Sequence, residues 1–549
     1  MAFRALSRFV KRLLLRRRRT DIQGQGPRLS SAHASLSIRL RENEAFIREA
    51  FGNSSDLIVR KVRFGTGRGI AVLVVHLDGL VDKELVSEAI IKPIGVTSEI
   101  LESERLSSIQ VKDRLRDRLI LVSDVKQVSD RTDFLSRIAE GKCGVVIGGS
   151  SEALVCDVRG FETRSIQEPQ SEVVIRGPRE GFSEVLRVNT SLLRRRIRDP
   201  RFWIEEFTVG RVSRTQVAIA YIKGIANDKV VQEARDRITR IDVDSIQESG
   251  KLEEYVEDAP FSPFPTILRT ERPDRVAGAL FEGRIAILTD GTPFVLIVPV
   301  TFLMFLTSPE DYYERFFIAS AVRLLRYASF FIAFLLPALY VAVTTFHQEM
   351  LPTPLVLAIA AQREGVPFPA VFEALLMEVA FEILREAAVR LPKIYGPAIS
   401  IVGVLILGEA AVRAGLVSSA MIIVVALTAI SSFVTPIFSL SIAVRLLRFP
   451  VILLAGALGL FGVVFGFSIA GIHLSSLRSF GVPFLEPVAP VVVSDLKDAL
   501  VRLPWWAIDT RPEFTGKSDL RRQSGGLMPR PPQPQAKGIP SGYRKKGPR

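Results

Sequence analysis

The chain has 549 residues, a mass of 60.8 kDa and a formal net charge of +14. Hydrophobic residues make up 48% of it and charged residues 24%, with a mean hydropathy of +0.26, which excludes both an ordinary soluble protein and an uninterrupted membrane bundle. Two cysteines exclude a disulfide scaffold, and four histidines leave little for a histidine-rich metal site. The positive charge favours an anionic partner, either lipid headgroups or nucleic acid.

Both ends of the chain are strongly basic. Residues 1–34 contain the run Arg16–Arg19, and apolar residues recur among the charges at helical spacing. This arm is either an amphipathic helix lying on an anionic membrane surface or a disordered basic tail. Residues 511–549 are rich in proline, glycine and basic residues, which is typical of a disordered tail.

The region from residue 35 to about 300 has a mixed pattern that predicts a soluble α/β part. Its first predicted elements are a helix over 39–51, a buried strand over 70–77, a helix over 82–91 and a hairpin with strands 143–147 and 153–158. Cys143 and Cys156 would face each other across that hairpin. A disulfide is the alternative, but a reducing cytoplasm favours two small buried thiols.

The second part of this region repeats the first. The matching segments are HLDGLVD at 76–82 with YIKGIAN at 221–227, and EGK at 140–142 with EGR at 282–284. The nearly equal offsets predict a duplicated α/β domain, with a first subdomain over 35–165 and a second over 166–308.

The apolar stretch over 293–306 would otherwise be scored as a membrane span. It is shorter than the roughly 20 residues that cross a bilayer, and Pro299 interrupts it. The repeat predicts a second hairpin with strands 285–288 and 295–298, so we interpret the stretch as the closing strand of the second subdomain. A re-entrant segment or a true first span is the alternative.

Residues 309–475 predict an α-helical transmembrane domain. Long runs with almost no charge predict four spans, near 327–346, 394–412, 415–444 and 451–473, the third breaking near Pro436. A fifth span is the alternative. Four spans place both basic ends on the cytoplasmic side by the positive-inside rule, although Arg445 and Arg448 fit this orientation less well. Residues 476–510 form a post-membrane segment.

The amphipathic segment over 347–393 lies between the first two predicted spans. Glu378, Glu382 and Glu386 follow each other at four-residue spacing, which places three carboxylates on one helix face. This face is either solvated on the membrane surface or lines a water-filled passage. In the second case, copies around a symmetric oligomer would form acidic rings that attract cations. Like charges at this spacing require partners, such as Arg385 and Arg390.

A second group of charges lies in the soluble half and predicts a subunit interface. Its members are Arg176, Arg179, Glu180, Arg194, Arg195 and Arg196. Acids such as Glu168 and Glu172 would form ion pairs with them, and binding of phosphate or anionic lipid is the alternative. Stacking aromatic residues do not interleave the basic ones, so nucleic acid is not expected.

Signatures of enzymes are missing from the sequence. It contains no Walker A sequence, no GxSxG and no HExxH, and its histidines are widely dispersed. We therefore expect no catalytic, cofactor-binding or metal-binding residues, and no enzyme.

Several sequence blocks stand in an order that is itself informative. They are FGNSSDL at 51–57, HLDGLVDK at 76–83, VIRGPREGF at 174–182, RVNTSLLRRRIRDP at 187–200, TERPDRV at 270–276, EGRIAILTDGTPF at 282–294, HQEMLPT at 347–353, REGVPFP at 363–369, LLMEVAFEILREA at 375–387 and LRSFGVPFLEP at 477–487. Together they resemble the A subunit of the GerA-type nutrient germinant receptors of spore-forming bacteria. One departure is Phe484, where that family often has tyrosine.

This resemblance implies a protein of the spore inner membrane that works with a transporter-like B subunit, which senses the nutrient, and a lipoprotein C subunit. It also implies that A subunits assemble into a homo-oligomer, with a pentamer expected, that forms a ligand-gated ion channel. Opening would release cations and commit the spore to germinate. A non-channel scaffold that docks the other subunits and a secondary transporter are the alternatives.

Overall fold

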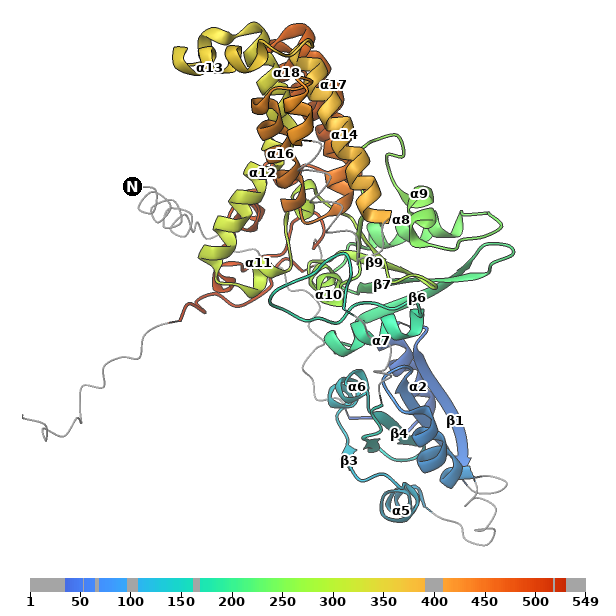
Figure 1. The fold of residues 1–549 in the computed structure, drawn as a ribbon. Helices are drawn as coiled ribbons and strands as arrows, with labels where there is room; N and C mark the ends of the chain where they lie inside the picture. Colours follow the sequence, from blue (N-terminus) through green and yellow to red (C-terminus); the bar gives the residue numbers. More distant parts are fainter. Residues whose placement is uncertain are drawn as a thin grey trace, which may run out of the picture.

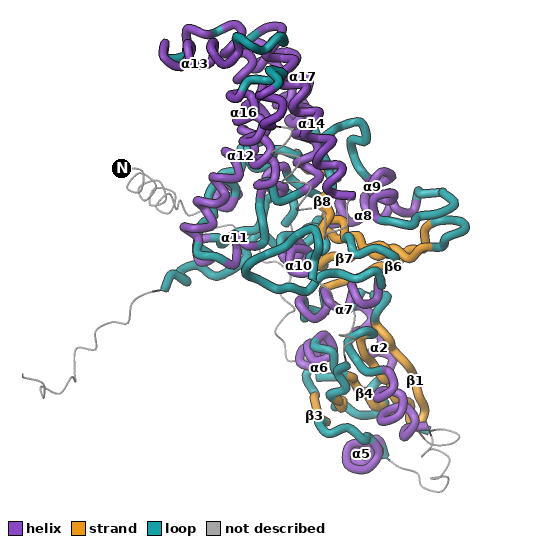
Figure 2. Tube along the Cα trace, viewed as in Figure 1, coloured by secondary structure: helices purple, strands orange, loops and turns teal. Residues whose placement is uncertain are grey.

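The computed structural model describes residues 35–529, except 53, 65–68, 96–106, 161–167, 391–407 and 517–518. The predicted basic arm, most of the predicted span over 394–412 and the end of the basic tail lie outside these residues. The chain is elongated, with two α/β units at one end and a helical bundle at the other (Figure 1). In Figure 2 the labelled strands lie below the bundle, which consists of helices.

The first unit is an antiparallel sheet with helices on both faces. Its described strands are ordered β1-β2-β4-β5-β3, with bounds β1 Leu57–Phe64, β2 Ile70–Leu77, β3 Val125–Val128, β4 Cys143–Ile147 and β5 Ala153–Cys156. Its described helices are α2 Leu40–Ala50, α3 Lys83–Val86, α5 Ser108–Arg114 and α6 Arg131–Ala139, with π-helical turns over Ser87–Ile91 and Leu115–Leu119. The predicted helix over 82–91 is therefore half π-helical.

The second unit repeats this arrangement. Its described strands are ordered β6-β7-β9-β10-β8, with bounds β6 Phe202–Val209, β7 Thr215–Ile222, β8 Leu268–Thr270, β9 Ile285–Thr289 and β10 Val295–Val298. The helices described here are α7 Leu186–Arg196, α8 Asp228–Thr239, α9 Ser249–Val256 and α10 Pro273–Phe281. The order matches strand for strand, as the repeat predicts, and the stretch after Pro293 contains strand β10 rather than a spanning helix.

The composition of the central strands explains why helices cover both faces of each sheet. On β2, Leu73 and Val75 pack into one core with α2 and α6, whereas Val72 and Val74 pack into the other core with α3 and α5. Alternate side chains point to opposite faces, so a strand that is apolar throughout needs cover on both.

Cys143 and Cys156 occupy directly opposite positions on β4 and β5, and both are free and buried. Burial raises the pKa of Cys156 to about 12 and that of Cys143 well above its ordinary value. Because the thiolate is the reactive form, we expect neither to react with a soluble disulfide reagent in the folded chain. Thiol titration before and after unfolding checks this, and rapid labelling of the native chain would contradict it.

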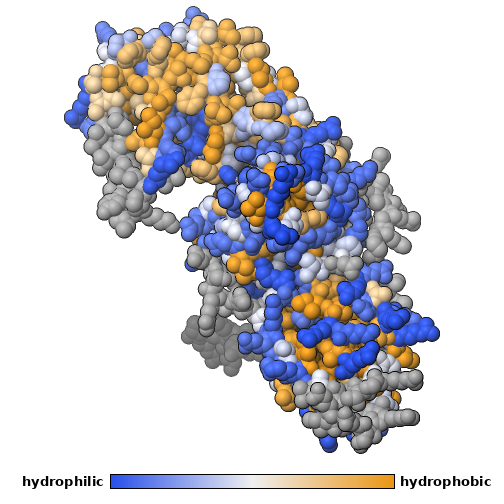
Figure 3. All heavy atoms as spheres, turned by 90° about the vertical axis from the view of Figure 1, so that its right-hand side faces the viewer, coloured by the Kyte–Doolittle hydropathy of each residue, from blue (hydrophilic) through white to orange (hydrophobic). Residues whose placement is uncertain are grey.

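The bundle follows a short connection that contains a 3₁₀ turn over Phe302–Leu306 and helix α11. Helix α11 of the connection is Glu310–Tyr313, and the described helices of the bundle are α12 Phe316–Phe346, α13 Thr353–Arg363, α14 Ala370–Arg390, α16 Ser419–Val434, α17 Phe438–Leu458 and α18 Leu460–Ser476. Among the described residues, α12 and α17 are long and apolar enough to cross a membrane, whereas α16 and α18 are shorter apolar helices. The surface of the bundle is largely hydrophobic, in contrast to the middle of the molecule (Figure 3).

The segment after the bundle returns to the second unit. It contains the small hairpin of β11 Arg478–Ser479 and β12 Val482–Pro483, and 3₁₀ turns over Asp495–Asp498 and Trp505–Ala507. The hairpin is held to the end of β10, because Val300 N donates to Ser479 Oγ at 3.0 Å. Phe484 packs against Phe302 and Phe305. The bundle is therefore connected to the second unit at both of its ends.

The predicted spans over 415–444 and 451–473 have the wrong limits. The chain does break near Pro436, but α17 begins at Phe438 and continues to Leu458. It contains both Arg445 and Arg448, which the sequence placed between two spans. A second break follows at Gly459, whose φ of 63° favours glycine. Charge is a poor marker of a helix end here, because both arginines find acidic partners on a neighbouring helix.

Two further segments differ from their predicted limits. Helix α12 begins at Phe316, before the predicted start of the first span, because Arg323 and Arg326 are neutralised within the protein. The amphipathic segment over 347–393 contains two helices, α13 and α14, that are separated by residues 364–369.

Candidate functional site

Buried ion pairs are the most informative features of this structure, because taking a charge out of water is costly unless a partner compensates it. The described residues contain such pairs where the two α/β units meet, where the second unit meets the bundle, and where α14 meets α17.

The two units are joined by a fully buried ion pair. Arg194 of α7 donates two hydrogen bonds to Asp56, from Nε at 2.7 Å and from Nη2 at 3.0 Å, and a third to Ser54 Oγ at 3.0 Å. Both charged side chains are 1% exposed. Burial acts to raise the pKa of Asp56, but the Arg194 guanidinium holds it below its ordinary value.

Arg194, which the sequence placed at a subunit interface, is buried between two parts of one chain. Its role in contacts between subunits stays a prediction. The pairing is intramolecular because Asp56, just before β1, comes from the first unit and α7 comes from the second. A backbone contact strengthens this joint, since Ser55 N donates to Ile204 O at 3.0 Å.

The other predicted interface residues also find partners within the chain. Arg196 contacts Glu180 at 2.7 Å, and Arg195 lies 3.6 Å from the same carboxylate. The exposed side chain of Arg176 lies 3.5 Å from Glu314. Arg179, which is also exposed, lies 3.4 Å from Glu168. Their role in contacts between subunits stays a prediction.

A basic cavity of about 290 Å³ lies beside this joint. The residues that line it are Leu80, Ala139, Glu140, Arg159, Glu180, Arg194, Arg195, Arg196 and Arg198. Both units contribute to it. Its excess of guanidinium groups suits a small ligand that carries a carboxylate or phosphate.

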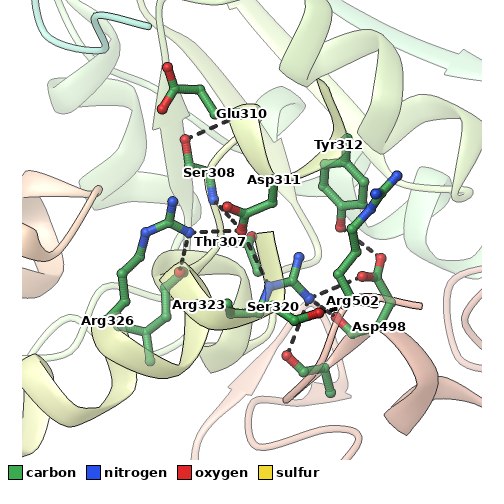
Figure 4. Close-up of polar contacts among 12 residues, drawn as sticks. Thr307, Ser308, Glu310, Asp311, Tyr312, Ser320, Arg323, Arg326, Asp498 and Arg502 are labelled. Carbon is green, nitrogen blue, oxygen red and sulfur yellow. Dashed lines mark hydrogen bonds and ion pairs between the residues drawn. The ribbon is translucent and has the colours of Figure 1, made fainter. Parts of the chain in front are cut away.

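The second site, which we call the junction, lies where α12 begins (Figure 4). It consists of Asp311, Tyr312, Arg323, Arg326, Asp498 and Arg502. Three separate segments supply these residues: the connection after β10, the first turns of α12, and the segment after the bundle.

Asp311 is the centre of the junction. Its carboxylate, 2% exposed, lies 2.7 Å from Arg326 Nη1 and 3.3 Å from Arg323 Nε. Arg323 also reaches Asp498 Oδ1 at 3.0 Å. One helix thus holds two buried guanidiniums that bind acids from both flanking segments, as Figure 4 shows.

The rest of the junction locks the same three segments together. Tyr312 Oη donates to Asp498 Oδ2 at 2.7 Å, and Ser320 Oγ donates to the carbonyl of Arg502 at 3.0 Å. Arg502 Nη1 donates to the carbonyl of Glu314 at 3.2 Å. Burial, together with the charge of Asp498, raises the pKa of Tyr312 well above its ordinary value, so its hydroxyl remains a neutral donor.

Sequence reasoning missed the junction. In the sequence, Arg323 and Arg326 are two positive charges just before the first predicted span, and nothing near them in the chain indicates their partners. A signal was present, because charges three residues apart at the start of a long apolar helix share one face and need partners there. The partners follow from the fold alone, since Asp498 is distant in sequence.

The segment after the bundle also contains a buried carboxyl group. Glu486, just after β12, is 2% exposed. Burial raises its pKa to about 7, while Arg284 acts in the opposite direction and Asp495 and Glu513 add to the rise.

This pKa predicts how stability depends on pH. Between about pH 4.5 and pH 7, Glu486 keeps its proton in the folded chain but loses it in the unfolded chain. The free energy of unfolding therefore falls progressively as the pH rises through this range, and the full loss is present above it. We expect Glu486→Gln to raise the free energy of unfolding by about 3 kcal/mol near pH 8, and to change it little near pH 4.5.

Thermal unfolding of the full chain in detergent at the two pH values measures this effect. The exposed carboxylate variant Glu184→Gln is the matched control and should show no such dependence. A pH-independent effect of Glu486→Gln would show that the group is already ionised in the folded chain.

The third site is the contact between α14 and α17, which contains the acidic ladder. Glu378 binds Arg448, and the two side chains are 1% and 2% exposed. Glu382 binds Arg445. The ladder therefore faces α17 at these two positions, where it binds Arg448 and Arg445. Of the two arginines that the sequence suggested, Arg390 does pair with the third carboxylate, Glu386.

In the described part of the chain, Glu386 and the two arginines near it do not contact α17 through an ion pair of the kind that Glu378 and Glu382 form. Glu386 remains exposed and pairs with Arg390 at 2.6 Å. Arg385 donates to Ser432 Oγ of α16 at 3.2 Å and lies over the ring of Phe433. A hollow of about 640 Å³ opens beside the ladder; it is lined by Val379, Glu382, Ile383, Glu386, Ala387, Arg390 and Phe449.

Comparison with known proteins adds an independent finding. Residues 45–514 match the family described as Bacillus/Clostridium GerA spore germination protein. The chain is 47% identical to spore germination protein KA of Bacillus subtilis (strain 168), over 90% of each chain. It is 43% identical to the uncharacterized membrane protein YfkQ of the same organism, over 87% of this chain and 91% of the relative.

Among solved structures, the chain is similar to the crystal structure of the N-terminal domain of the A subunit of the Bacillus megaterium spore germinant receptor GerK3. The two are 35% identical, with a TM-score of 0.38, over 49% of this chain and 98% of that one.

Proposed function

Because the chain belongs to the GerA family of spore germination proteins, we propose that it is the membrane subunit of a nutrient germinant receptor that converts germinant binding into ion release. Its relatives are spore germination A subunits, which have a role in germination and are not known enzymes. The long apolar helices α12 and α17 support a position in the membrane of the spore.

The junction is the observation that supports signal transduction best. Helix α12 enters the bundle from a network of buried charges that also holds the connection from the second unit. Any movement of that unit must therefore move the start of α12 or break buried ion pairs. Closely packed charges with two discrete arrangements are a physical means of carrying a conformational change.

The finer proposal is an oligomeric cation channel, with a pentamer expected. Glu386 is its first candidate for the cation pathway, because its carboxylate is exposed on α14. Glu382 comes next, since it borders the same hollow while bound to Arg445. Glu378 is buried with Arg448, so its proposed role is to position α14 against α17. Rings of such carboxylates around an axis would favour cations.

The proposal also includes the partner subunits of this chain and its orientation in the membrane. A transporter-like B subunit and a lipoprotein C subunit would assemble with this chain in the spore inner membrane. The α/β units and the basic ends would face the cytoplasm, where membrane lipids are anionic. The exposed pairs Arg176–Glu314 and Arg179–Glu168 would contribute to subunit contacts after rearrangement.

Flux of K⁺ from vesicles tests this proposal. The full chain is reconstituted alone and with its B and C partners, and the nutrient is added. Nutrient-dependent flux that requires this chain supports the channel. Assembly of the complex without flux favours the alternative of a docking scaffold. Flux that saturates and is coupled to a second solute favours a secondary transporter.

Glu386→Gln provides the sharper measurement. We expect it to lower K⁺ flux several-fold without unfolding the chain, because it removes an exposed charge from the proposed pathway. Glu409→Gln is the matched control, since Glu409 also forms an exposed pair of the same spacing and length, with Arg413 at 2.6 Å. Equal flux in both variants would remove Glu386 from the pathway.

A further inference from the structure

The loop between α9 and β8, residues 257–267, has an unusual composition. Its segment Ala259–Pro265 (APFSPFP) contains no charge, three prolines and two phenylalanines. In Figure 1 the chain between these elements rises from α9 toward the lower part of the bundle.

The loop is firmly held at the end of α18. Ser262 Oγ lies 2.9 Å from His473 Nε2, and the ring of Phe264 packs against the His473 ring. Phe264 is buried in the core that the second unit shares with the bundle. At its base, Asp258 binds Arg237 at 2.8 Å. The loop therefore has a fixed place relative to the bundle.

Phe261 nevertheless points out of the protein. It is fully exposed, at 101% of its reference area, although Asp258 before it and Ser262 after it are anchored. Pro260 beside it is exposed as well, and so is Tyr255 on α9. Burying a phenylalanine side chain is favourable, so a fixed loop that presents one to water forgoes that stabilisation.

The exposed apolar residues at the end of α18 indicate what covers Phe261. Ile469 and Ile472 are exposed apolar residues on the last turns of α18, directly beside the His473 that holds the loop. In the membrane placement proposed above, these residues face lipid near the end of a span. Because Ser262 contacts His473, its neighbour Phe261 lies close to this end of α18, where a bilayer around the bundle would meet water.

We propose that residues 259–263 insert into the boundary between lipid headgroups and acyl chains, with Phe261 as the anchor. An uncharged, proline-stiffened loop with an exposed aromatic ring suits this layer, and Tyr255 provides the amphipathic ring that such boundaries favour. The anchor fixes the second unit against the membrane surface, next to the bundle. The inference rests on the membrane placement of the proposed function.

Site-specific quenching of a fluorophore tests this insertion. Phe261→Cys and Pro260→Cys are each labelled with a small thiol-reactive fluorophore on the full chain in phosphatidylcholine–phosphatidylglycerol vesicles. The buried native cysteines leave the introduced thiol as the reactive one, and the unsubstituted chain is labelled in parallel as the check. Nitroxide lipids quench labels in the bilayer, and iodide quenches labels in water.

Two reference positions make the outcome decisive. Val212→Cys lies in the β6–β7 turn of the same unit and is 78% exposed, and Ile472→Cys lies on α18. We expect labels at 260 and 261 to be quenched by nitroxide lipids as strongly as the label at 472, and several-fold more than the label at 212. Iodide should give the reverse order.

Three results would overturn the inference. If the label at 261 behaves like that at 212 while 472 is lipid-quenched, the loop lies in water and the membrane placement stands. If both quenchers fail at 261, a protein surface covers the loop instead. If lipid fails to quench at 472 as well, the membrane placement of the bundle is itself wrong.

Discussion

Arg194→Ala is expected to lower the free energy of unfolding of the α/β units by about 3–5 kcal/mol. Removing the guanidinium leaves the Asp56 carboxylate buried without its partner, which is the costly way to break a buried ion pair. For a unit of this size the loss corresponds to a fall of roughly 6–20 °C in the unfolding midpoint. Thermal unfolding of the full chain in detergent, followed by circular dichroism, measures it.

Arg211→Ala is the matched control for this prediction. Arg211 also forms an ion pair with an aspartate, Asp242, in the α/β part of the chain, but both side chains are about two-thirds exposed. Exposed pairs contribute about 0–1 kcal/mol, so the control should scarcely shift the midpoint. Equal losses in the two variants would mean that burial of the Arg194–Asp56 pair has no special weight.

Asp311→Asn is the second change with a large expected effect. Asp311 is the shared acid of Arg323 and Arg326, and its neutralisation leaves two buried guanidiniums with one acid between them. We expect a loss of about 3–5 kcal/mol in stability. In the reconstituted receptor we also expect the nutrient-dependent flux to fall, because α12 is no longer fixed to the connection from the second unit.

A double variant separates charge balance from packing at this site. Asp311→Asn combined with Arg326→Gln removes one charge of each sign, so we expect it to be more stable than Asp311→Asn alone. The neighbouring change Glu310→Gln keeps an amide oxygen that accepts from Ile175 N, and it should cost less than about 1 kcal/mol. Additive losses in the double variant would argue against a coupled network at Asp311.

The two predictions concern successive contacts along one chain. Arg194 fixes the first unit to the second, and Asp311 fixes the second unit to the bundle. A variant that weakens the first contact should leave α12 in place, whereas a variant that weakens the second should uncouple the bundle. Comparing their effects on stability and on flux therefore shows which contact transmits the signal.

The sequence by itself determined the strands in which nearly every residue is apolar and buried. The strand over 70–77 and the hairpin with strands 143–147 and 153–158 are confirmed, although the second strand of the hairpin already ends at Cys156. An apolar run of that length between turn residues has few other conformations. The internal repeat predicted a second hairpin, and β9 and β10 form it. It also kept the stretch after Pro293 from being taken as a spanning helix. Sequence blocks alone identified the family.

Only the tertiary structure decided which acidic side chain pairs with which arginine. Glu378 binds Arg448, Arg194 binds Asp56 and Arg323 binds Asp498, and in each pair the residues come from segments far apart in the chain. Periodicity along one helix reports which residues share a face, but the element that packs against that face follows from the fold. For the same reason the limits of α12 and α17 were misplaced: an arginine ends an apolar helix only when nothing in the folded protein neutralises it.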